Sequence, residues 1–316
     1  MHKVLLVDFT DYKDELKDLL EANSYEVIIC ENAFDAMSKL KAYDFDLVIS
    51  EVELPGDNSF DLYNYMTSNY PYIPTIMMTD KNLDNFFEDI FREGIGNVLC
   101  KPVRENELIN LAAKLITKKD IFGISNFIKV TGPLRRIRIS TSRQIQTAIN
   151  TLIDELMDSG AEIANKMALN LVLNELTINA VYHSHGLTAE KEMRQTVVLK
   201  EDEFVEIHFT CSEEKFAIAI TDYNGRLTKM RILDSINNVI TQENLLSEAV
   251  EKGSDISGMI SETGRGIDLV RKLAGEYYFI IKKDYRTEVI LIFNSHPKPG
   301  DDSPFSSLKI IEDNAE

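Results

Sequence analysis

The chain has few cysteines, fewer basic than acidic residues and no long hydrophobic run, and each shortage excludes a class of protein. The three cysteines, Cys30, Cys100 and Cys211, lie scattered on apolar segments without metal-ligand spacing, so we expect core thiols in a reducing cytoplasm. No apolar run approaches the ~20 residues that span a bilayer, so no membrane association is expected. The chain has 34 Lys and Arg against 52 Asp and Glu, and this net charge of −18 lacks the basic footprint of a nucleic-acid-binding protein.

The composition indicates about two folded domains. The chain has 316 residues, of which 44% are hydrophobic, enough for two packed cores. Its first residues, Met1-His2-Lys3, run directly into an apolar strand. We therefore expect no secretory signal, and the predicted location is the cytoplasm.

Short apolar runs that end in polar side chains dominate the first third of the chain. They alternate with amphipathic helical segments, which is typical of a doubly wound parallel sheet, here with five strands. A helix expected over residues 105–119 would complete this α/β domain. Such sheets place their sites at the carboxyl ends of the strands. The polar residues at these ends are Asp8, Glu51, Thr79 and Lys101.

Residues 1–120 resemble the receiver domain of response regulators. Thr79 and the pair Lys101-Pro102 match that family's pattern. The resemblance implies a phosphate-accepting carboxylate and a metal-binding acidic pair among the other strand-end residues.

The candidate receiver site departs from this pattern. Glu51 stands at the position of the phosphate-accepting aspartate, and the acidic pair falls on Asp8 and Phe9. A phenylalanine cannot ligate Mg²⁺, which needs oxygen donors. We therefore predict a pseudo-receiver. Either Glu51 forms a permanent salt bridge with Lys101 that imitates a phosphorylated aspartate, or the site has decayed and only holds the fold; both interpretations stay open.

A polar stripe marks a helix expected from about Ala161 to near Gly186. Glu175, Asn179 and His183 are four residues apart and would lie above one another on an otherwise apolar helix. Burying a carboxylate, an amide and an imidazole is costly unless something binds them. Magnesium and a phosphate chain would satisfy all three, whereas a plainer alternative is a face turned to water.

Two glycine segments follow the polar stripe. The strand at 216–221 ends in Asp222-Tyr223-Asn224-Gly225, where the carboxylate suits an exocyclic amine and the glycine allows close approach of backbone. An ordinary Asn-Gly turn is the alternative. Gly264-Arg265-Gly266 then opens a helix, and free N–H groups at a helix start favour phosphate.

In this order, the motifs make residues from about 131 to 296 resemble the ATP-binding domain of histidine kinases, gyrase and anti-sigma-factor serine kinases. The resemblance implies that Asn179 ligates Mg²⁺ and that Asp222 binds the adenine amine. Departures are an extra residue in the first glycine segment, a single Gly-x-Gly step in the second, and Arg286 in place of a glycine before Thr287. The residues implied in ATP binding are Asn179, His183, Asp222, Gly225, Gly264, Arg265, Gly266 and Thr287.

The implied roles differ in kind. The backbone at Gly264 and Gly266 would hold phosphate, and Thr287 would support the adenine-binding group. Arg265 either touches phosphate or faces solvent. Glu175 is the matched candidate for a general base.

None of the five histidines lies on a long helical hairpin, which a self-phosphorylating histidine kinase needs. The second domain resembles the anti-sigma kinases most closely, which implies ATP·Mg²⁺-dependent phosphorylation of a serine or threonine on an anti-sigma antagonist. The alternatives are an ATP-gated interaction switch that sequesters a sigma factor, and plain ATP hydrolysis. Both resembled families often form homodimers, and the oligomeric state stays open.

The predicted organisation is a receiver-like domain at 1–120, a connector at 121–132, an α+β sandwich with a mixed sheet at 133–296, and a disordered acidic tail at 297–316. The segment 226–262 is the candidate lid, with one short amphipathic stretch. The strands expected in the second domain are 134–139, 196–200, 204–211, 215–221, 277–282 and 287–293.

Overall fold

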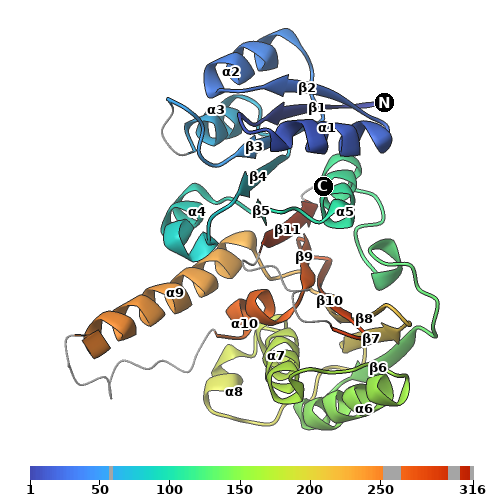
Figure 1. Cartoon of the computed structure of the whole chain (residues 1–316). Helices are drawn as coiled ribbons and strands as arrows, with labels where there is room; N and C mark the ends of the chain where they lie inside the picture. The colour runs from blue at the N-terminus through green and yellow to red at the C-terminus, as the bar shows by residue number, and fades with distance from the viewer. Residues whose placement is uncertain (57–59, 252–264, 298–306, 314–316) are drawn as a thin grey trace. The chain divides into compact units, whose positions relative to one another are not determined.

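The computed structural model describes residues 1–56, 60–251, 265–297 and 307–313 (Figure 1). Their contacts divide the chain into two compact units. The first unit comprises residues 1–119 and 307–309, and the second comprises the described residues from 120 to 297 together with 310–313.

The first unit is built on a parallel sheet in which the strand order is β2-β1-β3-β4-β5. Its strands are β1 (His2–Val7), β2 (Tyr25–Cys30), β3 (Leu47–Glu51), β4 (Thr75–Thr79) and β5 (Asn97–Cys100). Its helices are α1 (Tyr12–Ala22), α2 (Ala33–Ala42), α3 (Asp61–Asn69), η1 (Leu83–Phe86), α4 (Phe87–Glu93) and α5 (Glu105–Thr117). The predicted doubly wound parallel fold is confirmed for this unit.

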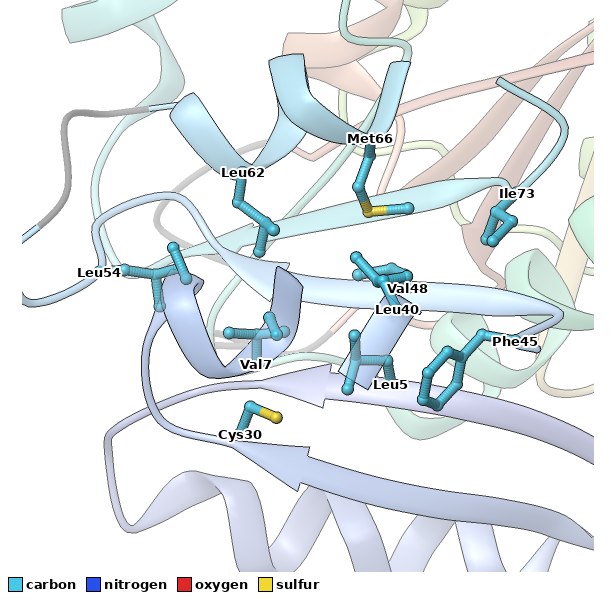
Figure 2. Packing of buried hydrophobic residues seen from close by; sticks show 12 residues of the cluster. Leu5, Val7, Cys30, Leu40, Phe45, Val48, Leu54, Leu62, Met66 and Ile73 are labelled. Atoms are coloured by element: carbon cyan, nitrogen blue, oxygen red, sulfur yellow. The ribbon is translucent and has the colours of Figure 1, made fainter. Parts of the chain in front are cut away.

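The core of the first unit explains why its strands are so apolar. Leu5 and Val7 of β1 and Val48 of β3 pack under Leu40 of α2 and Met66 of α3 (Figure 2). Successive strand residues point to opposite faces, and the residues between these are buried as well. A strand buried on both faces needs a continuous hydrophobic run, which these sequences supply.

The predicted disorder of the tail is wrong for residues 308–313, which form β11 (Leu308–Asp313). Within the first unit, Leu308 and Lys309 pair antiparallel with β5, and the Lys309 ammonium forms a buried ion pair with Glu107 of α5. The apolar residues of this short segment are buried. Their burial offsets the entropy of ordering the chain.

The second unit is an antiparallel sheet in the order β9-β10-β8-β7-β6, with residues 310–313 of β11 added parallel to β9. Its own strands are β6 (Arg135–Ile139), β7 (Val205–Cys211), β8 (Lys215–Asp222), β9 (Glu276–Lys282) and β10 (Arg286–Asn294). Its helices are η2 (Ile124–Asn126), η3 (Ser142–Gln144), α6 (Ile145–Asp158), α7 (Lys166–Ile178), the π turn η4 (Asn179–His183), α8 (Thr188–Glu192), α9 (Lys229–Glu251) and α10 (Arg265–Leu273). The sheet is mixed, as predicted.

Helices cover one face of this sheet and the connector covers the other. Helix α7 contacts α6 and α10, and α6 contacts β6 and β7 (Figure 1). On the opposite face, the ring of Phe127 in the connector packs at a tilt against that of Tyr278, with 4.4 Å between ring centroids, and the N–H of Gly123 donates to Glu288 at 2.8 Å. The apolar connector is therefore part of the second unit's core.

Three sequence expectations for this unit need correction. The stretch 196–200 forms only a single bridge, Thr141 to Val198, made by the hydrogen bonds from Ser142 N–H to the Val197 carbonyl and from Leu199 N–H to the Ser140 carbonyl. The polar-stripe helix begins at Lys166 and changes to a π turn after Ile178. In the candidate lid, the helix α9 is 23 residues long and replaces the short amphipathic stretch that was expected. The lid residues after α9 lie outside the described ranges.

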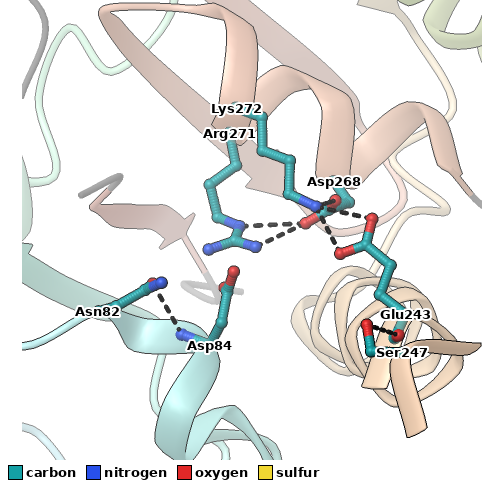
Figure 3. A network of polar contacts seen from close by, with 7 residues as sticks. All are labelled: Asn82, Asp84, Glu243, Ser247, Asp268, Arg271 and Lys272. Carbon is teal, nitrogen blue, oxygen red and sulfur yellow. Dashed lines mark hydrogen bonds and ion pairs between the residues drawn. The ribbon is translucent and has the colours of Figure 1, made fainter. Parts of the chain in front are cut away.

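In the first half of α9 the apolar residues keep a helical spacing, with Ile232, Leu233, Ile236, Val239 and Ile240 buried. Charged groups join it to α10 (Figure 3). Lys272 of α10 reaches Glu243 of α9 at 2.9 Å and Asp268 at 2.8 Å, and Asp268 also accepts from the buried Arg271 at 2.6 Å. These contacts fix the position of α10, whose first turn contains Gly266.

Candidate functional site

The four residues predicted for the receiver site lie at the carboxyl edge of the first unit's sheet. Asp8 follows β1, Glu51 ends β3, Thr79 ends β4 and Lys101 follows β5. Asp8, Glu51 and Thr79 are buried, and the Lys101 side chain is 12% exposed. The parallel strands end together, which brings residues from four separate segments into one site.

Lys101 joins the two carboxylates of this site. Its Nζ donates to Asp8 Oδ2 at 2.9 Å and forms an ion pair with Oε1 of Glu51. The ring of Tyr12 lies beside the same ammonium, with 5.0 Å between Nζ and the ring centroid. The expected contact between Glu51 and Lys101 is present, and Asp8 shares it.

Asp8 has no free carboxylate oxygen for a metal. Its Oδ1 accepts from the backbone N–H and the hydroxyl of Thr10, each at 2.7 Å, while Oδ2 is taken by Lys101. The adjacent Phe9 supplies no ligand atom. Across the described parts of the chain, no group of three or more His, Cys, Asp or Glu side chains is placed to hold a metal ion.

Burial opposes the charge on Glu51. Loss of solvent raises the pKa of the Glu51 carboxyl to about 7, although Lys101 acts in the other direction. Burial also lowers the pKa of Lys101, but its hydrogen bonds to Glu51 and Asp8 outweigh this and leave that pKa raised. The ammonium is therefore the fixed charge, and the Glu51 carboxyl gains or loses its proton near neutral pH.

Asp222 and its neighbours form the first part of the second unit's candidate site. The buried Asp222 ends β8, and its Oδ1 accepts from the N–H groups of Asn224 and Gly225 at 3.0 and 3.1 Å. Burial raises the pKa of Asp222, and the hydrogen bonds from the N–H groups of Asn224 and Gly225 oppose the shift. Thr287 lies directly opposite Asp222 in the pairing of β10 with β8.

Gly225 is needed by the protein's own backbone. Its φ is +59°, and an added Cβ would stand 2.2 Å from the carbonyl oxygen of Lys282 and 2.6 Å from the nitrogen of Tyr285. Asp284 N–H also donates to the Gly225 carbonyl at 3.2 Å. The glycine therefore lets the β8 turn close against the β9–β10 turn, a reason that the sequence did not reveal.

Glu175 and Gly266 lie side by side where α7 meets α10. A Cβ on Gly266 would stand 2.5 Å from Cβ of Glu175, so only glycine fits at the start of α10. This places the half-buried carboxylate of Glu175 next to a helix N-terminus. Gly264 lies outside the described residues, and only the backbone of Arg265 is described, as the first residue of α10.

A lysine that the sequence analysis did not select holds the other two members of the polar stripe. Lys191 of α8 donates from Nζ to Asn179 Oδ1 at 2.9 Å, and Nζ lies 3.2 Å from His183 Nε2. His183 Nδ1 lies 3.1 Å from the Thr188 hydroxyl. Burial and the charges of Lys191 and Arg231 lower the pKa of His183, which favours its neutral form. No sequence signal separates Lys191 from an ordinary helix-surface lysine.

These groups belong to one region of the second unit. The π turn that carries Asn179 and His183 contacts β8, which carries Asp222. The charge of His185, just past the turn, also acts on Asp222. π turns occur mostly as single insertions in α-helices, frequently at functional sites.

Comparisons with known proteins identify the first unit. Residues 4–113 match the family model of the response regulator receiver domain. The response regulator protein FleR of Pseudomonas aeruginosa is 31% identical over 113 residues, which are 35% of this chain and 24% of FleR. The response regulator-like protein PRR1 of Oryza sativa subsp. japonica is 30% identical over 115 residues, 35% of this chain and 22% of that protein. The chain thus spans about a quarter of these relatives' length.

Among solved structures, the signal receiver domain of an HD domain-containing protein from Pseudomonas fluorescens Pf-5 is 26% identical. The match covers 36% of this chain and 86% of that one, with a TM-score of 0.35. No helix among the described residues is both long and apolar enough to cross a membrane.

Proposed function

We propose that this chain, whose residues 4–113 are a response regulator receiver domain, is a signalling protein of the two-component type in which an atypical receiver controls a nucleotide-binding unit. The receiver part of this proposal depends on Lys101, whose ammonium is already paired with Glu51 and Asp8. A phosphoryl group and its metal would have to displace that ammonium from both carboxylates. The receiver is therefore a pseudo-receiver that does not cycle through an acyl phosphate.

A small phosphodonor tests this. Incubation of the full chain with acetyl phosphate and magnesium should add no phosphate by intact mass, whereas an authentic receiver domain treated in parallel should gain one. An acid-stable mass increase would reflect other chemistry, but a hydroxylamine-sensitive one at Glu51 or Asp8 would disprove the pseudo-receiver.

The second unit's proposed ligand is ATP, and the observation that carries this is Asp222. It is a buried carboxylate at a strand end with both backbone donors on Oδ1, which leaves Oδ2 as an acceptor for an exocyclic amine. An ionised group in such a position is costly without a donor that pairs with it. Adenine supplies that donor, and Thr287 lies opposite to support it.

The predicted magnesium site at Asn179 fits this region less well than the predicted adenine site at Asp222. Asn179 is the expected magnesium ligand, yet its Oδ1 accepts from the Lys191 ammonium at 2.9 Å. Mg²⁺ requires oxygen donors in near-octahedral geometry, and a cation already at the same oxygen repels it. We therefore assign no step of the activity to a metal at Asn179.

Two activities follow from ATP binding. In the first, Glu175 accepts the proton of a serine or threonine hydroxyl on a regulatory protein partner of the anti-sigma antagonist class, while the phosphoryl group is transferred. In the second, ATP acts on the candidate lid at 226–262, which contains the helix α9, and gates the docking of a partner such as a sigma factor, without transfer. The Lys191 contact with Asn179 favours the second, because phosphoryl transfer ordinarily depends on a divalent metal at the phosphates and Lys191 occupies the expected metal ligand.

Radiolabelled ATP distinguishes these outcomes. Label that moves to an added partner supports the kinase, release of ADP supports hydrolysis, and binding without either supports the gated switch. Failure to bind ATP at millimolar concentration, with or without magnesium, would remove the nucleotide proposal.

A further inference from the structure

We infer that Lys191 takes the place that the ATP-binding resemblance gives to magnesium, so that this chain binds the polyphosphate of its nucleotide through its own ammonium group. This rests on the proposed ATP binding and goes beyond it, because it names the group that neutralises the phosphates. It also predicts a nucleotide site that works without a divalent cation.

The placement of Lys191 carries the argument. Helix α8 (Thr188–Glu192) brings its side chain back over the π turn, where Nζ contacts Asn179 Oδ1 at 2.9 Å and His183 Nε2 at 3.2 Å. Asn179, which the resemblance assigns to the metal, and His183, which it assigns to nucleotide binding, therefore both contact the Lys191 ammonium. The Thr188 hydroxyl, 3.1 Å from His183 Nδ1, fixes the imidazole from its other side.

The Lys191 ammonium has one N–H donor more than its two contacts use. An ammonium has three N–H donors and no acceptor. Asn179 and His183 take two of them. The third is left for a phosphate oxygen, the kind of partner for which a lysine acts as a compact point charge.

Further positive charge gathers at the same end of the π turn. The charge of Arg231 acts on His183 together with that of Lys191. The guanidinium of Arg226 lies close to Gly186, since a Cβ there would be 2.8 Å from Nη1. Glu192 acts on His183, and Glu175 on Lys191, in the opposite sense. In a chain of net charge −18, three cations against these two carboxylates still match a polyanion better than a second cation.

A purely structural role is the competing explanation, in which Lys191 only ties α8 to the π turn. Both explanations predict some loss of stability when Lys191 is replaced. They differ in nucleotide affinity and in its dependence on magnesium, which a structural lysine would not change.

The test is equilibrium binding of a fluorescent ATP analogue to the full chain, with competition by unlabelled ATP, in excess EDTA and in excess magnesium chloride. We expect the two buffers to give similar affinity for the wild type. Lys191→Gln should lose about 10-fold to 100-fold in EDTA, the usual worth of a charge-assisted hydrogen bond. Its remaining affinity should become magnesium-dependent, because Asn179 Oδ1 is then free. Lys191→Arg should recover part of the loss.

Lys166→Gln is the matched control. Lys166 is an exposed lysine at the start of α7, about three turns before Asn179, and should bind ATP as the wild type does. The wild-type comparison of the two buffers remains decisive if Lys191→Gln fails to fold by circular dichroism. Binding that requires magnesium in the wild type, or that survives Lys191→Gln in EDTA, would overturn the inference and leave ATP binding intact. No binding in either buffer would instead overturn ATP binding itself.

Discussion

The buried carboxyl of Glu51 gives the receiver a pH-dependent stability that can be measured. Its pKa is about 7 in the folded chain against an ordinary value of 4.5, chiefly because of burial. Between these values the folded state binds more protons than the unfolded state, so stability falls as the pH rises. Below pH 4.5 both states hold the proton, and above pH 7 both have lost it.

The size of the effect follows from the shift. Each pKa unit corresponds to about 1.4 kcal/mol, so the free energy of unfolding should fall by about 3 kcal/mol across the window. Glu51→Gln has no proton to exchange and should show a flatter profile. The Lys101 ammonium keeps its hydrogen bond to Asp8 in this variant.

The assay is urea unfolding of the full chain, followed by circular dichroism at several values from about pH 4.5 to 8. The raised pKa values of Asp222 and Glu288 act in the same direction within the second unit. Subtracting the pH profile of Glu51→Gln from that of the wild type leaves the part of the unfolding free energy that depends on the Glu51 proton. Glu53→Gln, which removes an exposed carboxylate two residues away, should run parallel to the wild type. Parallel profiles for Glu51→Gln as well would show that Lys101 keeps Glu51 ionised and that burial does not decide its charge.

Three other substitutions test the second unit. Asp222→Asn should weaken binding of ATP about 10-fold to 100-fold by calorimetry, because an amide cannot reproduce the carboxylate acceptor; equal affinity would remove Asp222 from the site. Glu175→Gln should slow any transfer to a partner by about 10²–10⁴-fold while sparing ATP binding, and unchanged transfer would exclude it as the base. Gly225→Ala should cost about 1–3 kcal/mol in urea unfolding, since its Cβ would meet the Lys282 carbonyl at 2.2 Å, and a neutral result would contradict the turn geometry.

The sequence predicted the first unit well because its strands carry their own signal. Strands β1, β3, β4 and β5 are apolar runs, and each ends in or is followed by a polar residue that the parallel sheet brings to one edge; β2 is only partly buried and contributes no such residue. The contact of Lys101 with Glu51 followed from that edge. The second contact, with Asp8, depends on where one flexible side chain points, which a strand pattern does not fix.

In the second unit, the sequence predicted the strands but not the contacts between distant segments. Strands β7 and β8 alternate in side-chain size or polarity, β9 and β10 are apolar runs, and the predicted positions of all four are confirmed within one or two residues. The π turn was hidden because α and π hydrogen bonding make the same demand on local composition. Lys191 was hidden because its contact with Asn179 spans twelve residues and a change of helix direction. From the sequence, Gly225 was explained by the close approach of a ligand. The β9–β10 turn that actually requires a glycine there lies about sixty residues further along the chain, so no local pattern gave a sign of the contact.

The pairing of Lys309 with Glu107 has a practical consequence for anyone who wishes to isolate the receiver. A fragment cut at Lys119 would retain the Glu107 carboxylate, which is 5% exposed, but would lose the ammonium that neutralises it and the two residues that complete the edge beyond β5. Removing one partner of a buried ion pair costs about 3–5 kcal/mol, a large share of a small domain's stability. The excised fragment would be a poor stand-in for the domain that the intact chain carries, even though the deleted strand lies almost two hundred residues away along the polypeptide.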